Sequence, residues 1–456
     1  MVCWKTKNLQ GESRRNFLKL TTAFGAALGL DRAGILNVIA DVGGNALAQD
    51  ATKKTRPSIH LVAGNGGFAW FQLLWPHVEV ADSGNNNFAF HDYANVQPGD
   101  TDRPSRIASS TPFKGLGRAK QMTAFMAGNN ETHTATPNSA AALGNGQSML
   151  AAAAALQQVN SSLVPVIGIE PLTFGAATGA PAVTTVGDPE GIVELFNSAA
   201  SRFALQVPQD AALFEATYKA QVSLLKAATR RTMTKQLDIG RSASNFLGQN
   251  LADQLRPTAE DEARYEVNAG TENKLRNIAT TFMIAAKAFK MGLTQSIILP
   301  VMRDDPHGAF GDMNDLTNTV AALGRYFDKL HEDLNVTNTE TGRPYADDFV
   351  ITVHGDTTKD PLDRGGWPDG TARNSNWLYV FGNGRLKTGW FGEYKANGDV
   401  NSFNPVTGDT DPNRSSASTA GAASAAALFA IAGDSRRVQE FFNAEGIDGL
   451  INPVIL

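Results

Sequence analysis

The sequence contains almost no cysteine. Its single cysteine, Cys3, lies in the first few of 456 residues. The rest of the chain, residues 4–456, therefore has no disulfide, no thiolate nucleophile and no cysteine-ligated zinc site. A chain of this length can form a core large enough to fold without disulfides.

Charged residues are also scarce, at 19% of the chain, and the formal net charge is −5. Residues 1–48 carry six Lys or Arg and three Asp or Glu, so the rest of the chain has a net charge of −8. An acidic chain lacks the basic surface that nucleic-acid binding requires, and we expect no nucleic-acid partner. The hydrophobic content of 42% is enough for a substantial core.

The clearest motif lies near the N-terminus and reads Ser13-Arg14-Arg15-Asn16-Phe17-Leu18-Lys19. It matches the twin-arginine export pattern and is followed by a mildly apolar stretch, Leu18 to Leu30, too short for a membrane span of about 20 residues. Ala46-Leu47-Ala48 is a suitable cleavage site. We therefore predict a signal peptide at 1–48 and a periplasmic or extracellular mature chain, 49–456, with no transmembrane span. One alternative is a basic amphipathic helix of the fold, which would not need paired arginines beside Phe-Leu-Lys. Another is a signal that stays attached or is cleaved elsewhere, since the stretch from Asp31 to Asn45 is long and polar for the end of a signal.

Buried strands alternate with helical patterns along the mature chain. This alternation predicts an α/β protein with a mostly parallel, doubly wound sheet and helices on both faces. A mainly helical insertion is expected at 190–290. The predicted strands are 58–63, 122–127, 163–169, 296–301, 348–354 and 377–381, and the other predicted helices are 139–158, 316–334 and 420–432.

Candidate site residues follow the predicted strands. His133, Thr134 and Thr136 stand just before the helix predicted at 139–158. Backbone N–H groups at a helix N-terminus suit an anion, or a hydroxyl that attacks one. The alternative is ordinary helix capping by Thr136 or Ser139.

Two further strand ends carry residues that bind metals in proteins. Asp305 and His307 follow the strand at 296–301, and His354 and Asp356 lie at the end of the strand at 348–354. If the sheet is parallel, these ends share one crevice. Carboxylates and imidazoles there would suit one divalent cation such as zinc, manganese or calcium. The alternative is that each residue caps a turn or forms a surface pair.

Five segments, in this order, resemble the motifs of a known bacterial family. They are Gly66-Gly67-Phe68-Ala69-Trp70, Thr132-His133-Thr134, Asp304-Asp305-Pro306-His307, Val353-His354-Gly355-Asp356-Thr357 and Asn374-Ser375-Asn376-Trp377. The family is domain-of-unknown-function family 1501, whose fold belongs with alkaline phosphatases and sulfatases. The resemblance is distant, covers nearly the whole mature chain and includes the twin-arginine leader.

The chain departs from the family pattern at several chemically important positions. The aspartate of the family's G-G-x-D-G motif is absent after Gly67. The glutamate and arginine of E-F-G-R-T correspond to Val353 and Asp356, and the Asp-His pair of G-x-D-H-W-P corresponds to Ser375-Asn376. A complete site in this superfamily holds two metal ions beside a Ser, Thr or modified Cys nucleophile. This chain keeps about half of the ligands that the resemblance implies, and a site short of anionic ligands holds divalent cations poorly.

The resemblance therefore implies two hypotheses. In the first, which we favour, the chain is a degenerate, non-catalytic member that acts in binding or assembly with an exported protein partner. In the second, it is a metal-dependent hydrolase of small anionic phosphate or sulfate esters. Asp305, His307, His354 and Asp356 would then hold a metal, His133 would be a further ligand or an anion contact, and Thr134 or Thr136 would be the nucleophile.

Overall fold

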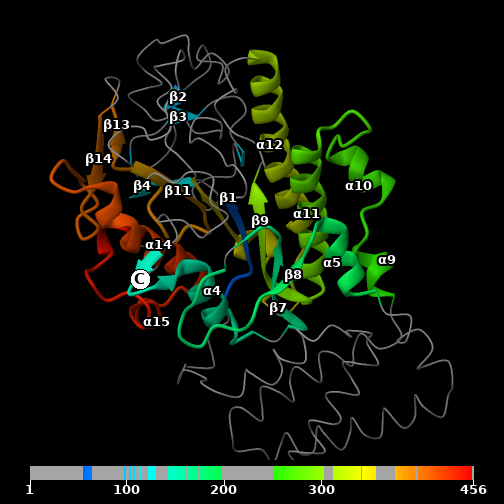
Figure 1. Ribbon diagram of the computed structural model, residues 1–456, viewed down its shortest axis with the longest axis horizontal. Coiled ribbons are helices and arrows are strands. Elements are labelled where there is room, and N and C mark those ends of the chain that lie inside the picture. Colours follow the sequence, from blue (N-terminus) through cyan, green and yellow to red (C-terminus); the bar gives the residue numbers. More distant parts are fainter. Residues whose placement is uncertain are drawn as a thin grey trace, which may run out of the picture.

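The structure is a computed structural model, shown in Figure 1. It describes residues 55–63, 97–98, 102–103, 106–107, 112–113, 122–129, 142–160, 162–172, 174–197, 250–301, 312–339, 341–355, 375–395 and 399–453. The predicted export signal lies outside the described residues.

An eight-stranded sheet forms the centre of the fold, in the order β12-β4-β11-β10-β1-β9-β7-β8. In chain order the strands are β1 (Ser58–Ala63), β4 (Met122–Asn129), β7 (Val164–Ile169), β8 (Thr184–Val186), β9 (Thr294–Val301), β10 (Val350–His354), β11 (Ser375–Phe381) and β12 (Gly389–Phe391). The six predicted strands are all present, with ends shifted by at most two residues.

The sheet is mostly parallel. Strand β1 pairs in parallel with both β9 and β10, and parallel pairing continues to β7 and β8. Only β11 runs the other way, because it is antiparallel to both β10 and β4, while β12 is parallel to β4. The carboxyl ends of β4, β10, β1 and β9 therefore lie at one edge of the sheet, together with the start of β11. We call this the carboxyl edge.

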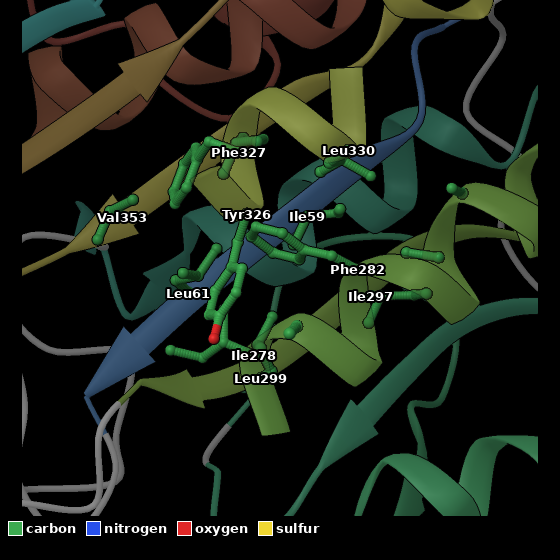
Figure 2. Packing of buried hydrophobic residues seen from close by; sticks show 14 of the residues in the cluster. Ile59, Leu61, Ile278, Phe282, Ile297, Leu299, Tyr326, Phe327, Leu330 and Val353 are labelled. Atoms are coloured by element: carbon green, nitrogen blue, oxygen red, sulfur yellow. The ribbon is translucent and has the colours of Figure 1, made fainter. Parts of the chain in front are cut away.

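One face of the sheet is covered by α11 (Asn273–Lys290) and α12 (Met313–Leu334). Ile59 and Leu61 of β1 pack there against Phe282 and Phe327, as Figure 2 shows. Fully burying side chains of this size stabilises a fold by about 1.5–3 kcal/mol each. Four short helices precede or follow these two in the chain: α5 (Pro189–Leu195), α9 (Leu251–Leu255) and α10 (Ala259–Arg264) come before α11, and α13 (Tyr345–Asp348) comes after α12.

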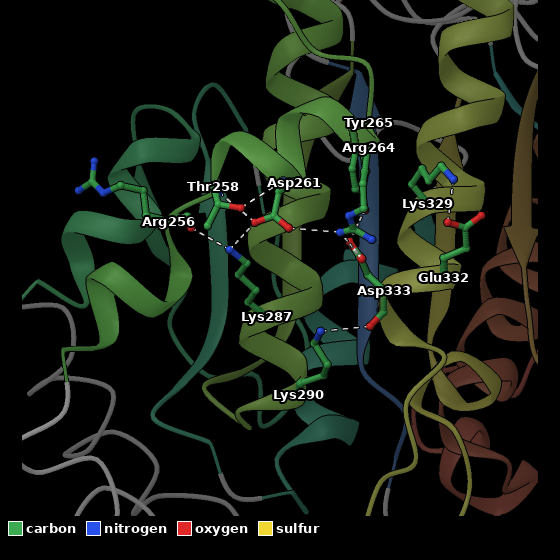
Figure 3. Close-up of polar contacts among 10 residues, drawn as sticks. All are labelled: Arg256, Thr258, Asp261, Arg264, Tyr265, Lys287, Lys290, Lys329, Glu332 and Asp333. Carbon is green, nitrogen blue, oxygen red and sulfur yellow. Dashed lines mark hydrogen bonds and ion pairs between the residues drawn. The ribbon is translucent and has the colours of Figure 1, made fainter.

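A polar cluster joins α10, α11 and α12 at the outside of this layer (Figure 3). Asp333 of α12 accepts a hydrogen bond from the Tyr265 hydroxyl at 2.9 Å and lies 2.5 Å from the guanidinium of Arg264. Asp261 of α10 pairs with Lys287 of α11 at 2.7 Å. Each helix is therefore tied to a neighbour by charge as well as by apolar packing.

The opposite face is covered by α4 (Met149–Gln157) and α14 (Ser416–Ala432), which are rich in alanine. Gln157, at the C-terminal end of α4, reaches Ser58 at the start of β1, with 2.9 Å between its Nε2 and the hydroxyl. In α14, Thr419 contacts the carbonyl of Met126 in β4, and Ile431 accepts from the backbone at the amino side of β1. Both helices therefore run against the strands, with their N-termini toward the carboxyl edge.

The remaining elements are short. Strands β2 (Gln97–Pro98) and β3 (Arg106–Ile107) pair, as do β5 (Ala142–Gly144) and β6 (Gln147–Ser148). A three-stranded sheet contains β13 (Glu393–Tyr394), β14 (Val400–Phe403) and β15 (Thr410–Asp411), and the chain ends with α15 (Ser435–Gln439) and the 3-10 helix η8 (Asp448–Leu450). No helix among the described residues is both long and apolar enough to cross a bilayer.

The helix predicted at 139–158 is wrong in its first half. A β5–β6 hairpin stands there, and α4 begins only at Met149. Asn145 and Gly146 have φ values of 52° and 73°, the left-handed backbone that a tight hairpin turn requires. Ser148 caps the helix by accepting from the backbone N–H of Leu150 at 3.2 Å. The expectation that residues just before Ser139 stand at this helix N-terminus therefore fails.

The helical prediction for 190–290 holds in the part that the structure describes, since α5, α9, α10 and α11 lie there. Residues 198–249 are outside the described residues. The helices predicted at 316–334 and 420–432 correspond to α12 and α14, each extended by a few residues at its N-terminus.

Candidate functional site

The carboxyl edge is where the sequence placed its candidate residues. Strands β9 and β10, which lead to Asp305 with His307 and to Asp356, lie on either side of β1. Neighbouring strands are about 4.8 Å apart, so these two strand ends are separated by roughly 10 Å. Of the candidates, only His354 is described. The others, His133, Thr134, Thr136, Asp305, His307 and Asp356, lie outside the described residues.

His354 is the last residue of β10 and is completely buried. Its side chain lies on the face covered by α4 and α14, because it alternates along the strand with Val353 and shares its face with Val350. The Nε2 atom is 2.8 Å from the Thr352 hydroxyl. Nδ1 has no hydrogen-bond partner within the described part of the chain. A buried polar atom left in this way costs about 1–3 kcal/mol.

A second buried histidine, His60 of β1, belongs to the same group. Its Nδ1 is 2.7 Å from the Thr352 hydroxyl, and its Nε2 is 2.8 Å from the Ser58 hydroxyl. A continuous chain of hydrogen bonds therefore runs from Ser58 through His60 and Thr352 to His354. We call these four residues the histidine chain. The sequence prediction missed His60, although the alternation of Ser58 and His60 with apolar residues was visible.

Both imidazoles are uncharged at neutral pH. Burial lowers the pKa of His60 to about 3. Burial, and next the proximity of His60, lowers the pKa of His354 well below its ordinary value. Desolvation penalises the charged form of any group in such a place. A neutral imidazole offers one N–H and one lone pair, so each ring can donate at one nitrogen and accept at the other.

The position that matches the family glutamate lies on the other face of the sheet. Val353 is fully buried in the apolar core formed with α11 and α12, beside Phe327 in Figure 2. Its partner across the strand pair is Tyr379. Since adjacent residues of a strand face opposite sides, His354 cannot take the place of a carboxylate at Val353.

The position that matches the family histidine is Asn376 at the start of β11. Its Nδ2 donates to the carbonyl of Gly355 at 3.1 Å, and its Oδ1 accepts from the backbone N–H of Trp377 at 2.8 Å. The nitrogen of the amide therefore joins β11 to the residue that follows β10, and the oxygen is used within β11 itself. Neither Val353 nor Asn376 fits a metal ligand, and in the described residues no three His, Cys, Asp or Glu side chains gather as a cation site would require.

Comparison of the chain with models of protein families, with curated proteins and with solved structures found no match. The geometry of the carboxyl edge and the sequence motifs are therefore the basis for a functional proposal.

Proposed function

We propose that this protein is an exported, non-catalytic member of the alkaline-phosphatase and sulfatase-like superfamily that uses the carboxyl edge of its sheet for binding or assembly. The observation that carries the proposal is that two positions where the family has metal ligands hold residues with a structural role in this chain. Val353 belongs to the apolar core, and the amide of Asn376 holds two strands together. Two-metal chemistry needs carboxylate or imidazole ligands at such positions.

Binding at this edge is supported by the direction of the strands. In open α/β sheets, ligands bind beyond the carboxyl ends of the strands. Seven of the eight strands share one direction, so their carboxyl ends lie at the same edge. The occupant we propose is an exported protein partner or a small anionic molecule.

A second candidate is a single-metal hydrolase of phosphate or sulfate esters. It is favoured by His354, whose buried Nδ1 has no hydrogen-bond partner among the described residues. His354 lies at the carboxyl edge, where β9 and β10 end, and Asp305, His307 and Asp356 follow these two strands in the sequence. His133 would add a ligand or an anion contact, and Thr134 or Thr136 would attack the ester. We rank this candidate second because the alternation of β10 turns His354 away from the face of Val353.

Metal analysis separates the two candidates. The full chain would be produced in a host with twin-arginine export, purified without chelators, and assayed for bound metal and for hydrolysis of aryl phosphates and aryl sulfates. We expect no stoichiometric zinc, manganese, calcium or iron and no hydrolysis. Bound metal and activity that are both lost in Asp305→Ala and His307→Ala, but kept in the exposed control Glu332→Ala, would establish the hydrolase instead.

Export is tested separately. Replacement of both Arg14 and Arg15 by lysine should keep the protein in the cytoplasm, whereas replacement of Lys5 and Lys7 by arginine should not. Cell fractionation with an antibody against the mature chain measures the outcome. Unchanged export of the Arg14→Lys, Arg15→Lys variant would contradict the proposed location.

A further inference from the structure

The histidine chain has a direction, which is set at its start by Gln157. The amide nitrogen of Gln157 donates to the carbonyls of Arg56 at 2.8 Å and Gln295 at 3.2 Å. These two acceptors show that the nitrogen of the amide, and not its oxygen, lies on the side of Ser58. The same nitrogen is 2.9 Å from the Ser58 hydroxyl. An amide nitrogen cannot accept a hydrogen bond, so Ser58 must donate its own hydrogen elsewhere.

Two acceptors lie near that hydroxyl. The Nε2 atom of His60 is 2.8 Å away, and the hydroxyl of Ser296 is 3.5 Å away. Hydrogen bonds from hydroxyls are normally 2.5–3.0 Å long, so Ser58 donates to His60. The neutral ring of His60 then carries its hydrogen on Nδ1 and donates it to Thr352 at 2.7 Å. Thr352 has one hydrogen and donates it to Nε2 of His354 at 2.8 Å.

The last ring of the chain is thereby fixed. Because Nε2 of His354 accepts and the ring is neutral, the hydrogen of the ring is on Nδ1. We propose that this Nδ1–H donates to an anionic oxygen of a bound molecule, a carboxylate, phosphate or sulfate group, at the carboxyl edge. The inference rests on the proposed function, since a protonated Nδ1 has no lone pair for a metal ion.

Two features of the described residues favour a negatively charged acceptor. The donor is fully buried, and hydrogen bonds strengthen where water is excluded. Helices α4 and α14 run against the strands on this same face, so the positive ends of both helix dipoles are directed toward the carboxyl edge. A neutral imidazole N–H is an established donor to developing negative charge in enzymes.

The tautomer can be measured directly. In full-length mature protein labelled with nitrogen-15 histidine, the ring nitrogens of His354, assigned by comparison with the His354→Asn variant, should report hydrogen on Nδ1. Titration with acetate, inorganic phosphate and sulfate in separate arms should shift these resonances in at least one arm, and the arm identifies the anion class. Hydrogen on Nε2, or resonances that no anion moves, overturns the proposal.

Variants of two residues give an independent readout through ligand-dependent thermal unfolding. The anion that acts on the wild type should bind His354→Leu about 10- to 100-fold more weakly, since one hydrogen bond to a charged group is lost. His354→Asn, which keeps an N–H near the position of Nδ1, should recover part of the affinity. Thr352→Ser should bind the anion like the wild type. Thr352→Val should bind it more weakly, because without the hydroxyl the hydrogen of the His354 ring is no longer held on Nδ1. Equal anion affinity in all four variants overturns the proposal.

Failure of this inference is distinct from failure of the proposed function. A protein that contains stoichiometric metal and hydrolyses esters contradicts the proposed function. A metal-free, inactive protein whose His354 resonances are shifted by no anion contradicts the inference alone. If His354→Leu does not fold, the wild-type tautomer and the Thr352→Ser and Thr352→Val pair still decide the matter.

Discussion

The rings of His60 and His354 lie on neighbouring parallel strands with their centroids 6.4 Å apart, and both contact the hydroxyl of Thr352. Two buried imidazoles that share one hydroxyl need that hydroxyl to donate to one ring and accept from the other. The pair therefore depends on Thr352 for its hydrogen bonds and on burial for its neutral state.

The first prediction concerns the hydroxyl of Thr352. In Thr352→Val the shape is kept, but one nitrogen of His60 and one of His354 lose their partner. We expect a loss of about 1–3 kcal/mol in the free energy of unfolding for each unpaired nitrogen. Thr352→Ser keeps the oxygen and should lose much less. Urea denaturation of both variants at neutral pH measures the difference, and equal stability would show that the contacts contribute nothing.

The second prediction concerns acid. Burial lowers the pKa of His60 to about 3 in the folded protein, against about 6.5 in the unfolded chain. Above pH 6.5 or so both states are neutral at this residue, and its contribution does not depend on pH. Below it the unfolded chain binds a proton that the folded chain does not, so stability falls by about 1.4 kcal/mol per pH unit until the folded pKa is reached.

Urea denaturation at about pH 7.5 and about pH 5 tests the sign of this effect. The His60→Gln variant, although less stable, should lose less stability between the two pH values than the wild type does. His354 remains in that variant and contributes in the same direction. An identical pH dependence in variant and wild type would contradict a neutral, buried His60.

The third prediction concerns Gly355, which follows β10. A Cβ added there would lie 2.6 Å from Nε1 of Trp377 and would also overlap the side-chain oxygen of Asn376. Overpacking of this kind costs about 1–3 kcal/mol, so Gly355→Ala should lower the melting temperature. Gly382, after β11, has nothing within 4 Å of the same position. Gly382→Ala is therefore the matched control, and calorimetry should find its melting temperature close to that of the wild type.

The fourth prediction compares adjacent carboxylates on α12. Asp333 is nearly buried and contacts Arg264 and Tyr265, whereas Glu332 is about half exposed and pairs only with Lys329 among the contacts in Figure 3. Asp333→Ala leaves the Tyr265 hydroxyl without this acceptor and should lower the free energy of unfolding by about 1–3 kcal/mol. Glu332→Ala should change it by less than about 1 kcal/mol. If chemical denaturation shows the same loss in the free energy of unfolding for both variants, the contacts of Asp333 do not stabilise the fold more than those of Glu332.

The strands were readable from the sequence because each is a short apolar run bounded by polar or glycine-rich residues. Their order was not. Strand β1 pairs with β10 nearly 300 residues later, and nothing local to His60 indicates Thr352 as a neighbour. Likewise, the apolar run from Trp377 to Phe381 predicts a strand but not that it would be antiparallel to its neighbours.

The hairpin before α4 carried a signal that the sequence prediction passed over. Asn145-Gly146 is the dipeptide that a tight hairpin favours, but the alanines on both sides gave the whole stretch a helical composition. Of the predicted site residues, the structure describes His354 alone. It confirms the predicted place of His354 at a strand end and adds which face it occupies, a property that depends on register and not on composition.

The single reversed strand has a consequence for engineering the chain. Strand β10 finishes and β11 starts at the same edge, and the backbone of Gly355 donates to the carbonyl of Trp377 at 3.0 Å. Gly355 and Ser375, the described residues on either side of this connection, therefore lie at the same edge of the sheet. New chain termini introduced between these two residues should keep β10 paired with β11, because that pairing depends on residues 351–354 and 378–381.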